Sequence, residues 1–241
     1  TSSASSIAEN AGLSTLTLTA TLSGKTHEDV TVSLGASGTG IEGSDYATIS
    51  DITISAGNTV GTTTFTATDD SLYEGNETAV IGISSVSGGG ASESGSQSVT
   101  LTITENDNTP TVTLTSSASS IAESAGSSLI LTATLSIAAD ADVTVSLSTS
   151  GAATEGTDYT TISDITISAG ETTGTVEFYP TYDTTYEGNE ASTISISGVS
   201  GGSAAEDGSQ SVTLTISESE SAPTVTLSSS DTSVLENAGL S

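Results

Sequence analysis

The chain has 241 residues, of which 30 are Asp or Glu and only one is Lys or Arg, so its formal net charge is −29. This charge excludes a nucleic-acid or anionic-membrane partner, because binding to either needs basic side chains that neutralise phosphate. The absence of Cys excludes disulfides and thiolate metal sites. The segment contains no run of about 18 apolar residues, which is the length that a membrane-spanning helix needs.

The sequence is internally repeated. Residues 48–57 reappear letter for letter at residues 161–170, a shift of 113. A shorter motif at residues 7–12 returns with small changes at residues 121–126 and again at residues 234–239. We therefore expect three units: a first repeat over residues 1–108 that lacks its opening strand, a second over residues 109–221, and the start of a third over residues 222–241.

Along the first repeat, apolar residues alternate with Thr and Ser, which is typical of strands with one buried face. Leu16, Leu18, Ala20 and Leu22, for example, fall on the same face. Turns rich in Gly, Asn, Asp and Ser separate these segments. The pattern predicts strands near residues 14–23, 29–35, 47–55, 59–68, 77–86 and 96–105. About seven strands in about 113 residues indicate an all-β chain of tandem immunoglobulin-like β-sandwiches.

A cluster of acids directly follows the fourth predicted strand. Asp69, Asp70, Glu74 and Glu77 place four carboxylates within nine residues, and a near copy occupies residues 182–190. Like charges at this spacing repel one another, and the chain has almost no Lys or Arg to offset them. Carboxylate oxygens gathered on a loop are the ligands that Ca²⁺ prefers. The loop therefore indicates a calcium site, and a solvated acidic loop is the alternative.

Catalytic chemistry finds no support in the sequence, and we expect that the protein is not an enzyme. A nucleophile–base pair of the Ser–His kind could involve only His27, the single His of the chain, which the second repeat does not copy. Two carboxylates can hydrolyse a glycoside, but the acid then needs an apolar or aromatic cleft that raises its pKa. Aromatic residues make up only 3% of this chain.

Several motifs, in this order, resemble the Calx-β family. They are Gly-Ser-Asp-Tyr at residues 43–46, Ile-Ser-Ala-Gly at residues 54–57, the acids of residues 69–77, and Ile103 followed by further acids. That family includes regulatory domains of sodium–calcium exchangers, domains of integrin β4, and tandem arrays in large bacterial surface proteins such as adhesins. The resemblance covers both full repeats, and it implies a seven-stranded sandwich that binds Ca²⁺ at the end where the last strand exits.

The resemblance also implies which residues bind the metal. In the first repeat Leu72 would offer its backbone carbonyl, and the carboxylate ligands would be Glu9, Asp45, Asp69, Asp70, Glu74, Glu77, Glu105 and Asp107. In the second repeat the equivalents are Glu123, Asp158, Asp183, Glu187, Glu190, Glu218 and Glu220. Because Tyr182 replaces Asp69 there, and Glu220 replaces Asp107, we expect the second repeat to hold fewer ions or to bind them more weakly.

These features predict a calcium-binding stalk, or extender, of a large extracellular bacterial adhesin or surface filament, secreted or anchored at the cell surface. Its partners would be neighbouring repeats of the same chain, with Ca²⁺ stiffening the short acidic joints at residues 105–110 and 218–223. The alternatives are an adhesive module that contacts a glycan or receptor directly, a Ca²⁺ sensor like those of the exchangers, and a filament subunit joined by strand donation. In the last case residues 224–227 of one copy would complete an open sheet edge of another, although truncation of a longer chain explains the same ends.

Overall fold

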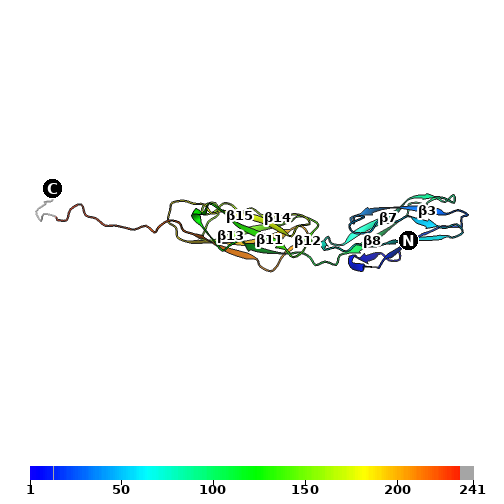
Figure 1. Cartoon of the computed structure of the whole chain (residues 1–241), viewed down its shortest axis with the longest axis horizontal. Helices are drawn as coiled ribbons and strands as arrows, with labels where there is room; N and C mark the ends of the chain where they lie inside the picture. The colour runs from blue at the N-terminus through cyan, green and yellow to red at the C-terminus, as the bar shows by residue number, and fades with distance from the viewer. Residues whose placement is uncertain (13, 234–241) are drawn as a thin grey trace.

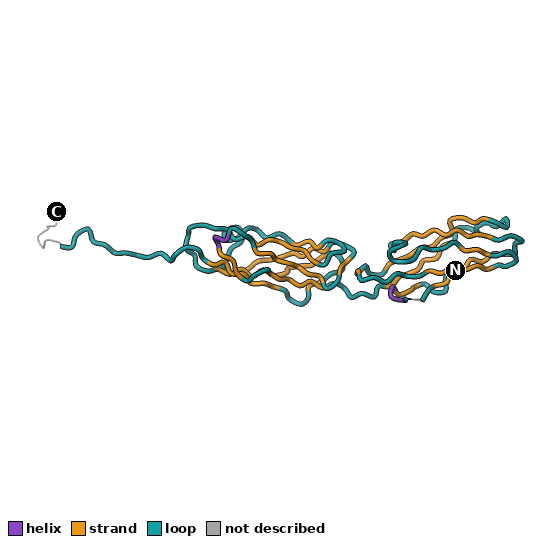
Figure 2. Tube along the Cα trace, viewed as in Figure 1, coloured by secondary structure: helices purple, strands orange, loops and turns teal. Residues whose placement is uncertain are grey.

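The computed structural model describes residues 1–12 and 14–233. It shows two β-sandwiches that lie end to end, followed by an extended segment that leads to the C-terminus (Figures 1 and 2). Among the described residues, helix is confined to two three-residue 3-10 turns, η1 (Glu9–Ala11) and η2 (Glu123–Ala125), and none is long and apolar enough to span a membrane. The expected all-β architecture is confirmed. The third copy of the repeated motif, at residues 234–239, lies outside the described residues.

The first sandwich packs a five-stranded sheet against a two-stranded one. The larger sheet has the order β1-β8-β7-β3-β4, with β1 (Ser6–Ala8), β8 (Ser98–Thr104), β7 (Glu77–Ser87), β3 (Val30–Gly38) and β4 (Ile52–Ile54). The smaller sheet pairs β2 (Leu16–Thr21) with β5 (Val60–Phe65). Neighbouring strands run antiparallel except for β1, which runs parallel to β8.

The second sandwich repeats this arrangement with a fuller opposing sheet. Its five-stranded sheet has the order β10-β18-β16-β13-β14, with β10 (Ser120–Ala122), β18 (Ser211–Ser217), β16 (Glu190–Ser200), β13 (Val143–Gly151) and β14 (Ile165–Ile167). The opposing sheet has the order β15-β11-β9-β17, with β15 (Thr173–Phe178), β11 (Leu129–Leu135), β9 (Thr111–Ser116) and β17 (Ala205–Glu206). Strand β9 lies antiparallel to β11 and buries Val112 and Leu114.

Each sandwich has its own core of Val, Ile, Leu and Ala around one aromatic pair. Tyr46 packs on Phe65 with ring centroids 4.9 Å apart, and Tyr159 packs on Phe178 at 4.7 Å. Tyr46 directly follows Asp45 in the chain. Burial of the tyrosine ring therefore fixes the loop that carries this acid.

One predicted strand is shorter than expected. The alternating pattern predicted a strand near residues 47–55, but β4 spans only Ile52–Ile54. Just before it, the Asp51 carboxylate accepts hydrogen bonds from Ser33 Oγ at 2.8 Å and from the Leu34 amide at 3.1 Å. The pairing of β3 with β7 shifts register between Ser33 and Leu34. A side chain therefore takes the place of backbone pairing at this point.

A short parallel pair, β6 (Leu72–Tyr73) with β12 (Ala138–Ala139), joins the two sandwiches. Strand β6 lies inside the acidic loop of the first sandwich, and β12 belongs to the second. The alternating pattern did not predict either strand, because a two-residue run leaves no periodic signal. This pair places the acidic end of the first sandwich against the near end of the second (Figure 1).

Candidate metal centre

Strand pairing brings acids from distant parts of the first repeat to one end of the sandwich. Because β1 runs parallel to the last strand, Ile7 lies beside Ile103, and Glu9 and Glu105, two residues further on in each case, come close together. Burial makes Glu9 an unusual acid, since only 5% of its surface is exposed. A buried carboxyl needs hydrogen bonds or a compensating charge to remain ionised.

A second connection adds Asp45 to the same end. An isolated antiparallel bridge joins Tyr46 to Ala67, and the Thr68 amide donates a hydrogen bond to the Asp45 carbonyl at 2.9 Å. The Asp45 carboxylate itself accepts a hydrogen bond from the Ile41 amide at 2.5 Å. This loop therefore holds Asp45 beside the start of the acidic loop that follows β5.

The carboxylates of the first sandwich form two groups that share Glu74. One group contains Glu9, Asp70 and Glu74, and the other contains Asp45, Glu74 and Glu77. Within each group, one carboxylate oxygen of every member lies within 4.8 Å of those of the other two. Oxygen ligands lie about 2.3–2.6 Å from a bound Ca²⁺, so two ligands of the same ion are at most about 5 Å apart. Each group therefore has the size of one coordination shell.

Burial and mutual repulsion change the acidity of these groups. Burial raises the pKa of Glu9 to about 7. Burial, followed by the charge of Asp45, raises the pKa of Glu74 to about 7. The pKa of Glu77 rises to about 8, through burial and a hydrogen bond shared with Asp45. Near neutral pH these carboxyls hold protons that a bound cation would displace.

Glu105 has a different role, because its carboxylate is held by backbone amides. Its Oε2 accepts hydrogen bonds from the amides of Glu74 at 2.8 Å and Gly75 at 2.9 Å. Its Oε1 accepts from the amides of Asn106 and Asp107, both at 2.8 Å. Burial acts to raise the pKa of Glu105, but these N–H donors outweigh it and lower the pKa. The ionised group ties the acidic loop to the end of β8.

Two buried oxygens point to a positive charge at these ends. Asp107 Oδ2 and its counterpart Glu220 Oε2 are buried, and no donor among the described residues reaches either of them. Within the same residues the one ion pair joins His27 to Glu28 at 3.5 Å, so it compensates neither oxygen. Burying a carboxylate oxygen without a partner costs free energy. A hard cation such as Ca²⁺ fits this set of all-oxygen donors.

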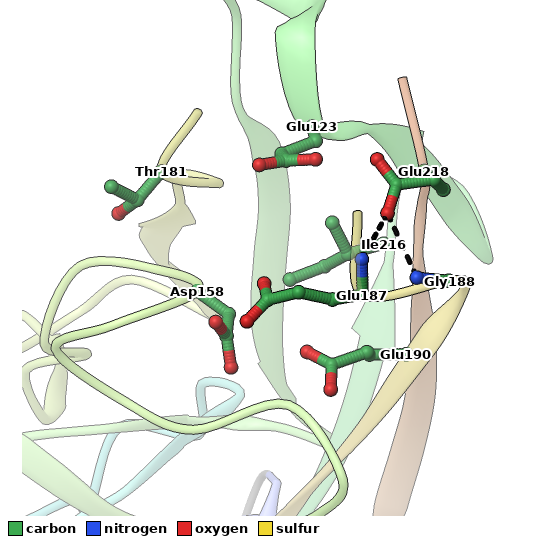
Figure 3. Close-up of a pocket in the computed structure, with 8 residues that line it drawn as sticks. All are labelled: Glu123, Asp158, Thr181, Glu187, Gly188, Glu190, Ile216 and Glu218. Carbon is green, nitrogen blue, oxygen red and sulfur yellow. Dashed lines mark hydrogen bonds between the residues drawn. The ribbon is translucent and has the colours of Figure 1, made fainter. Parts of the chain in front are cut away.

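The second sandwich carries the equivalent acids in two separate groups. They are Glu123 with Glu218 and Glu220, and Asp158 with Glu187 and Glu190. In Figure 3 the second group surrounds a hollow, and Glu123 and Glu218 lie above it in this view. The hollow has room for about one water-sized particle. It can therefore accommodate a single ion but not an organic ligand.

Glu218 repeats the anchoring role of Glu105. Its Oε2 accepts hydrogen bonds from the amides of Glu187 at 2.6 Å and Gly188 at 2.8 Å (Figure 3). Together with the Glu220 amide, these donors lower the pKa of Glu218 to about 2. Burial and the charge of Asp158 raise the pKa of Glu187. In both sandwiches, the acid that backbone amides hold is therefore distinct from the acids that repel one another.

Tyr182 changes the second site relative to the first. It occupies the position of Asp69, and the Glu220 carboxylate beside its hydroxyl raises the pKa of Tyr182. A neutral phenol therefore stands where the first sandwich has a carboxylate. That the second sandwich holds fewer or weaker ions stays a prediction, and this replacement is its structural basis.

The remaining predicted ligands lie outside the four groups. Asp69 and Asp183 are exposed, and Leu72 is half-buried within β6. Asp183 Oδ1 accepts a hydrogen bond from the Thr185 amide at 2.6 Å, and Asp70 Oδ1 accepts one from the Leu72 amide at 2.7 Å. These contacts shape the loops, and the ligand role of each residue stays a prediction.

The sequence did not predict two contributors to the site, namely an Asn that is present in both repeats and Asp140 of the second repeat. Asn76 Oδ1 accepts a hydrogen bond from the Glu105 amide at 3.0 Å, and Asn189 Oδ1 accepts one from the Glu218 amide at 2.9 Å. The Gly-Asn-Glu triplet occurs in both acidic loops, which was the available signal. The second contributor is Asp140. His27 occupies its position in the first repeat, so that repetition did not mark it.

The fold and the site together define a class of protein, namely tandem immunoglobulin-like β-sandwiches that gather carboxylates where the last strand exits. Residues 2–107 match the Calx-beta domain family, and residues 107–204 match the LapA domain family. The first sandwich thus matches the Calx-beta domain, and the second, which repeats its arrangement of strands, matches the LapA domain. The resemblance inferred from the motifs is confirmed.

The chain is also similar to several solved structures. The CBD12 fragment of CALX1.2 is 16% identical, with 88% of this chain and 95% of that one covered and a TM-score of 0.36. The adhesin InvE of Yersinia pseudotuberculosis is 12% identical, with coverage of 89% and 57% and a TM-score of 0.38. Invasin, a bacterial integrin-binding protein, is 18% identical, with coverage of 91% and 39% and a TM-score of 0.39. No curated protein matches the chain.

Proposed function

We propose that this chain is a calcium-binding structural repeat, a stalk or extender, of a large extracellular bacterial adhesin or surface filament. One observation carries the proposal. Among the described residues, each sandwich gathers its carboxylates into groups the size of a Ca²⁺ coordination shell, and no basic side chain is paired with them. The match of residues 2–107 to the Calx-beta domain supports calcium as the ion, and the tandem arrangement supports the role of a spacer.

The residues of the first sandwich show how an ion would order the joint. When bound, a divalent cation supplies the positive charge that the chain lacks. Glu74 and Glu77 then release the protons that they hold near neutral pH. Glu105 keeps the acidic loop on the end of β8, and the chain runs from β8 into the second sandwich within a few residues. Ordering this loop therefore restricts the angle between the sandwiches.

The shape of the repeats suits a spacer. Strand β7 has 11 residues, which at about 3.3 Å per residue corresponds to about 36 Å. The two sandwiches lie end to end (Figure 2), so that each added repeat extends the array by about the length of one sandwich. An extracellular location is part of the proposal, and sites of this kind outside cells bind Ca²⁺ with about 0.1–1 mM affinity.

Calcium titration of the full chain by calorimetry, with thermal unfolding in Ca²⁺ and in EDTA, tests the proposal. We expect Ca²⁺ to release heat and raise Tm, and Asp70→Asn to weaken binding by the first sandwich. Glu28→Gln is the matched control, because Glu28 is exposed and lies outside every acidic group. If 5 mM Ca²⁺ changes neither the heat signal nor Tm, the proposed function is wrong.

Strand donation between copies is a second candidate, favoured by a groove in the first sandwich. The groove has a volume of about 780 Å³ and is lined by apolar side chains that include Leu18, Leu22 and Val99. In the second sandwich, β9 pairs with β11, the counterpart of β2, and buries Val112 and Leu114. Their counterparts near the C-terminus, Val225 and Leu227, are 96% and 100% exposed. Residues 224–227 of another copy, or a strand preceding Thr1 in a longer chain, would fit the groove.

Light scattering across a range of protein concentrations separates these occupants. Strand donation predicts concentration-dependent oligomers of the 241-residue chain that Val225→Asp with Leu227→Asp converts to monomers. A chain that stays monomeric at 100 μM excludes donation between copies, whereas a preceding strand of the same chain remains compatible with that result.

A further inference from the structure

The contact between the sandwiches is made by the acidic loop itself. Strand β6, which pairs with β12 of the second sandwich, lies between Asp70 and Glu74. The Asp140 amide extends this pairing by donating a hydrogen bond to the Tyr73 carbonyl at 3.2 Å. Backbone pairing of this kind fixes both register and distance. The second sandwich is therefore attached to the same loop whose acids form the metal groups of the first.

Asp140 adds an acid from the second sandwich to the acidic end of the first. It directly follows β12, and its side chain is exposed. Its charge contributes to the raised pKa of both Glu74 and Glu77, behind burial and the nearer acids. Among the described residues, no basic group pairs with it. Without a cation, the acid of one sandwich thus repels the acids of the other across the contact.

The loop that carries Asp140 is fixed to its own sandwich on both sides. The Ala139 carbonyl accepts a hydrogen bond from the Gly170 amide at 2.8 Å. Asp142 Oδ1 accepts one from the Ala169 amide, also at 2.8 Å. Asp140 therefore moves with the second sandwich as a body, and its distance from the first sandwich's acids reports the angle of the joint.

The first sandwich has the same loop, with Lys25 and His27 ahead of the acids Glu28 and Asp29. The Thr26 carbonyl accepts from the Gly57 amide, and Asp29 Oδ1 accepts from the Ala56 amide, both at 2.8 Å. With the repeat shift of 113 residues, Lys25 takes the place of Ala138, and His27 takes the place of Asp140. The single Lys and the single His of the chain thus lie on the loop that, in the second sandwich, docks against an acidic end.

We propose that the residue directly after the docking strand, Asp140 here, determines whether a joint between repeats requires a cation. With Asp140, acid faces acid, so that close docking and cation binding in the first sandwich strengthen each other by the same factor. A loop with Lys25 and His27 at these two positions has no acid directly after the docking strand, so that it docks on an acidic end with less need of a metal ion. This inference rests on the proposed calcium site and names the residue outside the first repeat that is coupled to it.

Two variants of the full chain test the inference. Asp140→Asn removes the charge with little change of shape, and Ala138→Lys with Asp140→His transfers the charged residues of the first loop to the second. Glu177→Gln is the matched control, because Glu177 is an exposed acid of the same sandwich on β15, outside every acidic group. Because the chain has no Cys, spin labels at Ser85→Cys and Ser209→Cys report the distance between the sandwiches without interference.

We expect the label distance of the parent chain to be narrowly distributed in Ca²⁺ and broad in EDTA. Asp140→Asn should narrow the distribution of label distances in EDTA, because less repulsion opposes docking. It should also weaken Ca²⁺ binding by the first sandwich about fivefold at low salt. The double variant should show a narrow distribution of label distances in EDTA and bind Ca²⁺ more than tenfold more weakly than the parent chain. These differences shrink in about 1 M KCl, where charges are screened within about 3 Å, and Glu177→Gln behaves as the parent.

The two proposals fail in different ways. If the parent chain binds Ca²⁺ but both Asp140 variants match it in affinity and in label distance, the calcium site stands and the inference about the joint is wrong. If the parent chain shows no Ca²⁺ binding at all, the proposed function fails first. The inference is also wrong if the distribution of label distances is equally narrow in EDTA and in Ca²⁺ for all variants.

Discussion

Replacing Glu77 by Gln should have opposite effects on stability with and without calcium. The side chain begins β7 and lies in the group with Asp45 and Glu74. Its pKa is raised to about 8 by burial and by the hydrogen bond with Asp45, so that ionising it in the cation-free fold is unfavourable. Gln imitates the protonated carboxyl, and it keeps a donor for Asp45 without adding charge.

The size of the effect follows from the site. Because Glu77 is only partly buried, solvent screens much of the repulsion, and we take the gain in the cation-free fold at pH 8 as on the order of 1–2 kcal/mol. For a domain of about 100 residues, 1 kcal/mol corresponds to a shift in Tm of about 4–8 °C. In millimolar Ca²⁺ the variant loses one anionic ligand, and a tenfold loss of affinity costs about 1.4 kcal/mol of ligand-induced stability.

Differential scanning calorimetry at pH 8 measures both effects in the same protein. Glu77→Gln should raise Tm of the first sandwich in EDTA and lower it in 5 mM Ca²⁺. Glu190→Gln, at the equivalent position in the second sandwich, should behave in the same way for that unit. A fall in Tm of equal size under both conditions would show that Glu77 acts by packing or hydrogen bonding, and it would refute the argument from repulsion.

Three further predictions follow from the same structure. In EDTA, stability should fall as the pH rises from about 5 to 8, because the folded chain binds protons on Glu74 and Glu77 that the unfolded chain has already released; Ca²⁺ should remove this slope in thermal melts. Glu105→Gln should destabilise the first sandwich by about 1–3 kcal/mol with or without Ca²⁺, because its oxygens accept four backbone hydrogen bonds; a loss seen only in Ca²⁺ would contradict the anchoring role. Gly151→Ala should cost more than about 2 kcal/mol in urea unfolding, because φ is 133° and a Cβ would lie 2.2 Å from the Ala191 carbonyl oxygen. Gly198→Ala has no atom within 4 Å of its added Cβ and should be close to neutral.

The local patterns of the sequence were sufficient for the class of fold and for most of the acids at the site. Strands with one buried face leave a two-residue period, as on β11, where burial alternates along the whole strand. The shift of 113 residues revealed the repeat, and four like charges in nine residues marked the acidic loop. Residues such as Asp51 interrupted the pattern without warning, because a side chain that replaces backbone hydrogen bonds has no periodic signature.

Only the tertiary structure decided which acids come together and which have another role. Glu9 and Glu105 are 96 residues apart, and the parallel pairing of β1 with β8 brings them close together; Glu105 then proves to be held by amides, whereas Glu9 is buried with a raised pKa. The contribution of Asp140 depends on the β6–β12 pair between two sandwiches. A carboxylate's charge is written in the sequence, but its pKa and its partners depend on distances across the fold, because electrostatic and hydrogen-bond free energies vary over a few ångströms.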